Sequence, residues 1–346
     1  MLTYRENWLR AAEFRYPEWI PCSAGFSPLT WRSYGPDLER IIQDHPRIFP
    51  EYKPGSIRYD EMPVVYRQGE SYRDNWGCVW YNIQDGLEGQ VVEHPLADWS
   101  ALATYRMPDP RSQTERGTRD WGEIRRDIEE RRAKGLLTFG DGERLFDRLY
   151  FLRGFTNLMF DIAEEPPEFF RLLEMLEDYE LRLIKLWLEI GVDVIGFHTD
   201  IGTQHGLMLS PSKFRKLIKP MFKRLFQTCR QAGTHVSLSS DGCLVEIVDD
   251  LVECGVSVHD PQLRANTLEG IARAYKGKLC ANVDLDRQSF PFLTPAQLRE
   301  QVKQVVDVMA APEGGLMLLA QFYGGQEIPL QNIEAVLDAM EDYCFP

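Results

Sequence analysis

The 346-residue chain lacks three features that would each indicate a large class of proteins. No segment approaches the roughly 20 consecutive apolar residues that a membrane-spanning helix needs. No glycine-rich G-x-G-x-x-G follows an apolar run, so the main sign of a dinucleotide-binding sheet is missing. The seven cysteines include no C-x-x-C pair. Their scattered positions favour reduced, mostly buried thiols over a disulfide framework, and we therefore expect a cytoplasmic protein.

Positive charge is also scarce, with 39 lysines and arginines against 53 acidic residues and a net charge of −14. Such a balance repels phosphate backbones and anionic lipids, so we expect neither nucleic acid nor a membrane as a partner. It also disfavours a substrate with many carboxylates, unless arginines are gathered locally. The first residues, "MLTYRENWLRAAEF", are charged and have no apolar core, so no signal peptide is expected.

What is present is a regular alternation of short apolar runs with helical patterns from residue 136 onward. The runs are "LLTFG" (136–140), "DVIGFH" (193–198), "HVSLSS" (235–240), "VSVHD" (256–260), "KLCANVD" (278–284) and "LMLLAQF" (316–322). Alternating strands and helices of this kind predict a parallel sheet covered by helices. A further strand is expected at 19–26 and an eighth between 59 and 83. We therefore predict a (β/α)₈ TIM barrel with an irregular N-terminal extension.

The chain contains no evident linker or low-complexity tract, so one barrel domain is predicted over residues 1–346. Residues 1–135 form its irregular N-terminal part, with the first strands and lid-like insertions. Residues 136–346 hold the regular βα units.

Polar residues follow the predicted strands where a barrel would bring them to one mouth. Five of the six runs end at an aspartate or are followed by one within two residues. Asp200 and Asp241 follow two consecutive runs, and His198 lies two residues before Asp200. Titratable groups crowded in this way shift one another's pKa values, which is typical of an active site. The alternative is that each aspartate caps a helix or closes a turn. We predict Asp241, Asp200, His198 and Tyr323 as catalytic residues.

Other side chains are predicted to contact the substrate around this mouth. The polar candidates are Ser239, Gln204, His205, His259, Gln262, Asn282 and Gln321. The aromatic residues Phe26, Trp76 and Trp80, with Trp31 and Tyr81, are expected to form the wall of an apolar pocket. Their alternative role is to pack the irregular N-terminal part. If a metal is bound, we expect an oxygen-rich site made by His198, Asp200 and Asp241.

The segments "GVDVIGFHTDIGTQHGLMLSPSKFRKLIKPMFKRLF", "HVSLSSDGCLVEIVDDLVECGVSVHDPQ", "GGLMLLAQF" and "EIPLQNIEAVLDAM" resemble the uroporphyrinogen decarboxylase superfamily, which includes corrinoid-dependent methyltransferases. The N-terminal "DNWGCVWYNIQDGLEGQVVEHPLADWSALATYRMPDP" is similar to the methyltransferase-like branch. The resemblance implies a barrel whose site lies at the carboxyl ends of the strands.

Two departures from the superfamily bear on the reaction. True decarboxylases carry arginines for the substrate carboxylates in an N-terminal Arg-Gln-Ala-Gly-Arg stretch, whereas "CSAGFSPLTW" precedes the first nearby arginine, Arg32. Thiol-activating methyltransferases of the superfamily hold zinc with a His-x-Cys pair and a later cysteine. The corresponding positions are Ser239, Asp241 and a place near Gln321 or Phe322. We therefore expect Ser239 and Asp241 to form hydrogen bonds and transfer protons at this strand end, rather than to hold a thiolate-type zinc site.

The resemblance favours a methyltransferase of the O-demethylase type, which demethylates a small methoxylated or methylated compound and passes the methyl group to a corrinoid carried by a partner protein. Its residues would position the donor and protonate the leaving oxygen, and Asp241→Asn is expected to abolish demethylation. The alternative is a cofactor-independent decarboxylase, and a third possibility is a non-catalytic ligand-binding barrel. A homodimer would be ordinary for this fold.

Overall fold

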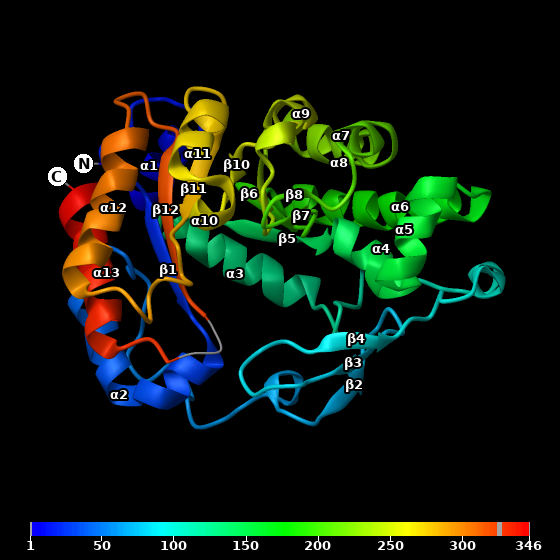
Figure 1. Cartoon of the computed structure of the whole chain (residues 1–346), viewed down its shortest axis with the longest axis horizontal. Helices are drawn as coiled ribbons and strands as arrows, with labels where there is room; N and C mark the ends of the chain where they lie inside the picture. Colours follow the sequence, from blue (N-terminus) through cyan, green and yellow to red (C-terminus); the bar gives the residue numbers. More distant parts are fainter. Residues whose placement is uncertain (1, 324–326, 346) are drawn as a thin grey trace.

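The computed structural model describes residues 2–323 and 327–345. Its central element is a curled sheet of seven parallel strands in the order β1-β12-β11-β10-β9-β6-β5 (Figure 1). These strands are β1 (Cys22–Phe26), β5 (Phe139–Arg144), β6 (Val194–His198), β9 (His235–Ser239), β10 (Val258–His259), β11 (Cys280–Asp284) and β12 (Leu316–Phe322). Every predicted apolar run thus overlaps a strand, although β5 begins three residues after the start of its run and extends four residues beyond its end. The predicted fold class, an α/β barrel with an irregular N-terminal part, is confirmed.

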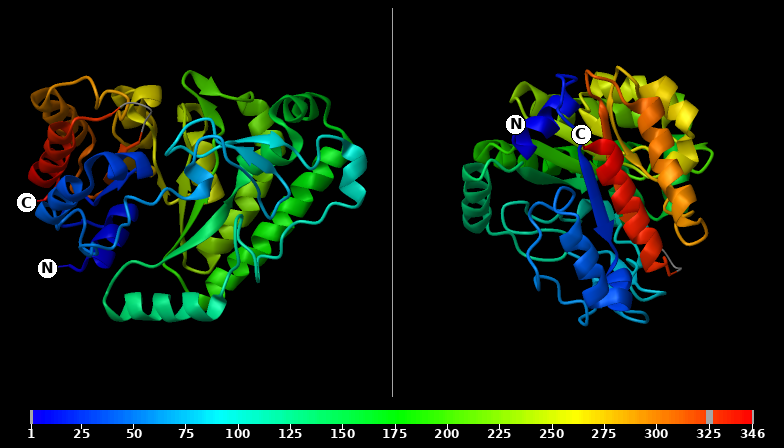
Figure 2. Two further views of the ribbon diagram at one scale, coloured as in Figure 1. Left: turned by 90° about the horizontal axis from the view of Figure 1, so that it is seen from below. Right: turned by 90° about the vertical axis from the view of Figure 1, so that its left-hand side faces the viewer.

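Helices follow most strands and cover the outside of the sheet (Figure 2). The longer ones are α1 (Tyr4–Ala12), α2 (Pro28–Asp44), α3 (Trp121–Ala133), α4 (Leu145–Arg153), α5 (Phe155–Glu164), α6 (Pro167–Ile190), α8 (Lys219–Gln231), α9 (Val248–Cys254), α11 (Leu268–Tyr275), α12 (Pro295–Met309) and α13 (Leu330–Cys344). The short helices are α7 (Pro211–Lys213) and α10 (Leu263–Asn266). None of the helices in the described part of the chain is both long enough and apolar enough to cross a membrane.

The segment between β1 and β5 does not supply the expected eighth barrel strand within the described residues. It forms a separate antiparallel sheet of β2 (Ser71–Arg73), β3 (Val79–Tyr81) and β4 (Gln90–Glu93). The reason is a tight turn at Gly77, whose positive φ of 86° favours glycine. Asp74 closes the turn by accepting a hydrogen bond from the Cys78 backbone N–H at 2.8 Å. The hairpin therefore folds back on itself, beside α4 (Figure 1).

The core joins the irregular part to the regular units. One hydrophobic cluster contains both Trp80 of β3 and Phe151 of α4, whose ring centroids are 4.8 Å apart. The same cluster includes Trp187 of α6, which packs edge-on against Trp121 at 4.9 Å. Large aromatic side chains buried between layers contribute much of a core's stability, so the N-terminal part is held firmly against β5 and α6.

Gly140→Ala is expected to destabilise the protein by about 1–3 kcal/mol, since a Cβ at this position of β5 would lie 2.6 Å from the Trp187 ring. That ring has little room to move because it packs on Trp121. Gly196→Ala on the neighbouring strand is the matched control, because the nearest atom to its Cβ is 3.9 Å away. Urea unfolding of both variants tests this expectation, and equal stabilities would contradict it.

Candidate active site at the carboxyl ends of the strands

Three aspartates are linked in a row where β6 and β9 end. Asp147, in the first turn of α4, accepts a hydrogen bond from the Asp200 backbone N–H at 2.8 Å. Asp200 in turn accepts one from the Asp241 backbone N–H at 2.9 Å. Asp200 and Asp241 are therefore neighbours at one rim. Their carboxylates differ, however, because that of Asp241 is 53% exposed and forms an ion pair with Arg287 at 3.1 Å.

A second acidic group lies where β9, β10 and β11 end. Asp260 accepts hydrogen bonds from the Ser239 hydroxyl at 2.6 Å and from the Ser240 backbone N–H at 3.1 Å. Asp284, the last residue of β11, forms an ion pair with Arg287 at 3.3 Å. Arg287 thus connects Asp284 to Asp241. Ser239, predicted as a substrate contact, is occupied in orienting Asp260.

Burial raises the pKa of several of these carboxyl groups. Burial, with the nearby Asp200 charge, raises the pKa of Asp147 to about 7. Burial also raises the pKa of Asp200 and brings that of Asp260 to about 8. Burial raises the pKa of Asp284 to about 7, although the Arg287 charge opposes this shift. A protonated carboxyl group in such a site can act as a general acid.

The buried carboxyl of Asp260 predicts a pH-dependent stability difference. Because its folded-state pKa lies above the unfolded value, its contribution is fully present below about pH 4 and is lost as the pH rises through about 8. The asparagine in Asp260→Asn cannot ionise. When the pH is raised from 5 to 9, the free energy of unfolding of the variant is therefore expected to increase by about 1 kcal/mol or more relative to that of the wild type. Urea unfolding at both values measures this difference, and a difference that does not change with pH would contradict the prediction.

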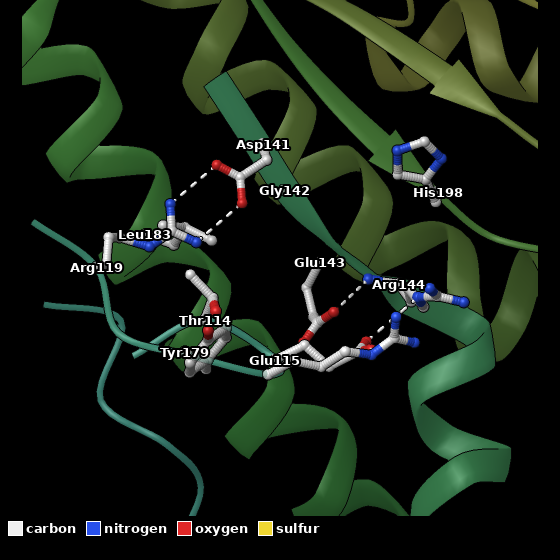
Figure 3. Close-up of a pocket in the computed structure, with 11 residues that line it drawn as sticks. Thr114, Glu115, Arg119, Asp141, Gly142, Glu143, Arg144, Tyr179, Leu183 and His198 are labelled. Atoms are coloured by element: carbon white, nitrogen blue, oxygen red, sulfur yellow. Dashed lines mark hydrogen bonds and ion pairs between the residues drawn. The ribbon is translucent and has the colours of Figure 1, made fainter. Parts of the chain in front are cut away.

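A cavity of about 330 Å³ opens beside this rim, between β5, α6 and the loop 114–119 (Figure 3). Its lining residues are Thr114, Glu115, Arg116, Arg119, Asp141, Gly142, Glu143, Arg144, Tyr179, Leu183 and His198. Of the predicted catalytic residues, His198, at the end of β6, lines this cavity at its edge (Figure 3). The desolvated position of His198 and the Arg144 charge lower the pKa of its imidazole, so the ring is neutral at neutral pH.

The remaining polar candidates are distributed around the mouth. Gln204 and Gln262 line a small cleft of about 10 Å³ together with Asp284 and Arg287. Gln262 accepts a hydrogen bond from the Gly242 backbone N–H at 2.9 Å. His205 is exposed in the hairpin formed by β7 (Gly202–Thr203) and β8 (Gly206–Leu207).

The candidates on β12 and β11 lie nearer the sheet itself. Tyr323 follows β12 and approaches Gly25, where its hydroxyl would lie 3.1 Å from an added Cβ. Burial raises the pKa of Tyr323, so its hydroxyl keeps its proton. Asn282 of β11 and Gln321 of β12 are half-buried.

Three candidates, His259, Trp76 and Trp80, are buried away from the mouth, which corrects their expected positions. His259 is fully buried and its Nδ1 lies 2.9 Å from the Tyr275 hydroxyl of α11, so its ring packs against a covering helix. Trp76 and Trp80 are also buried in the core. Phe26, by contrast, is half-buried at the end of β1 and stacks on Phe322 with ring centroids 5.1 Å apart, so its place in a pocket wall stays a prediction. The tryptophans take the alternative role, packing the irregular N-terminal part.

A metal site needs several ligand side chains grouped around one point. In residues 2–323 and 327–345, no three His, Cys, Asp or Glu side chains are grouped so that they could hold a metal ion. The oxygen-rich site expected from His198, Asp200 and Asp241 is therefore not assembled. The positions that resemble the zinc ligands of thiol-activating relatives hold a serine hydroxyl engaged with Asp260 and a carboxylate engaged with Arg287, so the donor set does not fit a thiolate-type zinc.

Comparison with known proteins assigns the class and then the family. A solved structure described as a methyltransferase from Methanosarcina mazei covers 99% of both chains with a TM-score of 0.63 at 16% identity, which shows a shared α/β barrel-like fold. The model of the family Uroporphyrinogen decarboxylase (URO-D) matches residues 145–343. A uroporphyrinogen decarboxylase from Thermus thermophilus is 26% identical over 178 residues, 50% of this chain and 48% of that protein, so the match spans about half of the relative's length. The chain belongs to the uroporphyrinogen decarboxylase family, as predicted, and family and fold are those of enzymes.

Sequence reasoning did not single out Asp147, Arg287 or the arginines of the cavity. Asp147 lies in a helical pattern, and its contact with Asp200 spans 53 residues of sequence. Asp260 and Asp284 gave a usable signal, because both follow predicted strands, as Asp200 and Asp241 do. A rule that treated every aspartate ending a strand as a candidate would have included them.

Proposed function

We propose that the chain transfers a methyl group from a small methoxylated or methylated compound to a corrinoid carried by a separate protein. The observation that carries this proposal is the row of carboxyl groups at one rim, in which Asp147 accepts from the Asp200 backbone N–H and Asp200 accepts from the Asp241 backbone N–H. Burial raises the pKa of both Asp147 and Asp200. A corrinoid supplies a strongly nucleophilic cobalt that takes the methyl group. The task left to the protein is to hold the donor and make its leaving oxygen a better leaving group.

Asp200 is the best-placed proton donor. Its carboxyl group lies at the mouth, and the Asp241 N–H occupies only one of its oxygens. Asp147 lies behind it and is coupled to it, since the Asp200 charge raises the pKa of Asp147. Burial raises the pKa of Asp200 as well, which favours the protonated form that a general acid needs. Asp241 is less suited, because it is exposed and paired with Arg287.

The runner-up function, a cofactor-independent decarboxylase, also has support. The family model and the Thermus relative carry the decarboxylase name. Arg287, at the mouth between Asp241 and Asp284, would receive a substrate carboxylate if the substrate displaced the exposed Asp241 carboxylate. The same protonated carboxyls would then deliver a proton to the developing carbanion. A ligand-binding barrel without turnover is the third possibility.

One experiment separates these functions. The purified protein is mixed with a reduced corrinoid protein and a donor labelled with ¹³C in its methyl group. Our proposal expects the label on the corrinoid and one equivalent of demethylated product. Carbon dioxide released from a carboxylated compound without any corrinoid would favour the decarboxylase. Binding of either compound without product would favour the ligand-binding barrel and contradict both enzymes.

A further inference from the structure

The charged side chains that line the cavity beside His198 form ion pairs with carboxylates of the protein. Arg119 donates two hydrogen bonds to the two carboxylate oxygens of Asp141, both at 2.9 Å (Figure 3). Its side chain is only 4% exposed, and its guanidinium lies 5.1 Å from the Trp121 ring and 5.6 Å from the Trp187 ring. This arrangement fixes Arg119, so its charge is directed to Asp141.

The other two arginines that line the cavity are also paired. Arg144 donates to both carboxylate oxygens of Glu88 at 2.9 Å. Arg116 forms ion pairs with Glu88 and with Glu115. Each of the three arginines therefore already has a carboxylate partner, and the lining offers no unpaired cation to a ligand.

The groups that remain available for a ligand are hydrogen-bonding groups. The neutral ring of His198 and the side chains of Thr114 and Tyr179 line the cavity. Asp141 contributes acceptor oxygens, because its side chain is 60% exposed and its charge is balanced by Arg119. Leu183 adds an apolar surface. Such a lining matches the hydroxyl and ether oxygens of an uncharged ring compound.

An anion would bind poorly in this cavity. To pair with Arg144 or Arg116 it would have to displace Glu88 or Glu115, which are only 28% and 16% exposed and would be left without a partner in a partly buried site. To pair with Arg119 it would have to displace Asp141 from a guanidinium that is only 4% exposed. The volume of about 330 Å³ also lies at the small end of ligand pockets. We propose that the cavity binds an uncharged, hydroxyl-bearing ring compound of the size of a methoxyphenol and excludes the corresponding carboxylate. The inference rests on the proposed function only in taking this compound as the methyl donor. Asp200 does not itself line the cavity, but it follows the lining residue His198 by two residues.

The test compares two ligands that differ in one group, 2-methoxyphenol and 2-methoxybenzoate, by isothermal titration calorimetry with the full chain at pH 7. The phenol stays uncharged there, because phenolic groups ionise near pH 10. We expect the phenol to bind at least about ten-fold more tightly than the benzoate. Equal affinities, tighter binding of the benzoate, or no binding of either ligand at millimolar concentration would each overturn the proposal.

A substitution should reverse the preference. Asp141→Asn keeps the shape of the side chain but leaves the Arg119 charge without its carboxylate, so affinity for 2-methoxybenzoate is expected to rise at least about ten-fold. Asp249→Asn, which alters an exposed aspartate of α9 paired with Lys278, is the control and should change neither affinity. Unchanged benzoate affinity in a folded Asp141→Asn protein would overturn the assigned role of the Arg119–Asp141 pair.

The outcomes also separate this inference from the proposed function, because binding is measured without corrinoid or turnover. Tight binding of the phenol with no methyl transfer would remove the methyltransferase proposal and leave the cavity's preference standing. Methyl transfer from a carboxylated donor, with no binding of the phenol, would remove the proposed preference of the cavity and leave the methyltransferase proposal standing.

Discussion

Asp200→Asn is expected to lower the rate of methyl transfer by about 10²–10⁴-fold, which is the usual contribution of a general acid. The asparagine keeps the size of the side chain and can still accept the Asp241 N–H bond, now 2.9 Å long. It cannot give up a proton to the leaving oxygen. Single-turnover measurements with saturating donor would report the loss in the transfer step itself.

Two comparisons distinguish proton donation from a structural effect of Asp200→Asn. A donor whose leaving phenol has a pKa well below 10 needs less help, so its transfer should be much less sensitive to the substitution. Asp241→Asn is the matched control at the neighbouring strand end. The sequence alone predicted that it would abolish demethylation, but the exposed Asp241 carboxylate is paired with Arg287, so we now expect a loss below about ten-fold. Near-normal turnover in Asp200→Asn would remove Asp200 from the proposed mechanism.

The fold could be predicted from local patterns wherever the chain is regular. A buried strand in a parallel sheet is a short apolar run whatever its neighbours are, and runs such as 316–322 coincide with their strands. The expected eighth strand was a different case. Val79 to Tyr81 has a strand-like composition, but its partners in the antiparallel hairpin are set by the Gly77 turn and the Asp74 cap. Composition alone does not show which sheet a strand joins.

The site was predictable only in part, for a related reason. Parallel strands bring their carboxyl ends to one rim, so the proximity of Asp200 and Asp241 followed from topology. The ion pair between Asp241 and Arg287 did not, because it depends on how the loop after β11 turns. The cavity lining was also hidden, since Arg119 comes from an irregular loop that carries no periodic signal. Topology predicts which strand ends meet. The partners of individual side chains depend on loop conformations that the sequence pattern does not show.

The buried Arg148 gives the largest expected effect on stability. Its side chain is fully buried and forms ion pairs with Glu115 at 2.6 Å and Glu143 at 3.1 Å. Its guanidinium also lies 4.4 Å from the Trp76 ring. Arg148→Met fills a similar volume but leaves buried carboxyl groups without their cation. We therefore expect a loss of about 3–5 kcal/mol in the free energy of unfolding.

Urea unfolding at pH 7 measures this loss, with Arg182→Met as the control. Arg182 is a half-exposed residue of α6 paired with Asp178, so its replacement should change stability by no more than about 0.5 kcal/mol. Adding Glu115→Gln to Arg148→Met should recover part of the loss, because the second change removes a charge that the first left unpaired. A loss below about 1 kcal/mol in Arg148→Met, or no recovery in the double variant, would show that these ion pairs do not hold the N-terminal part against β5 and α4.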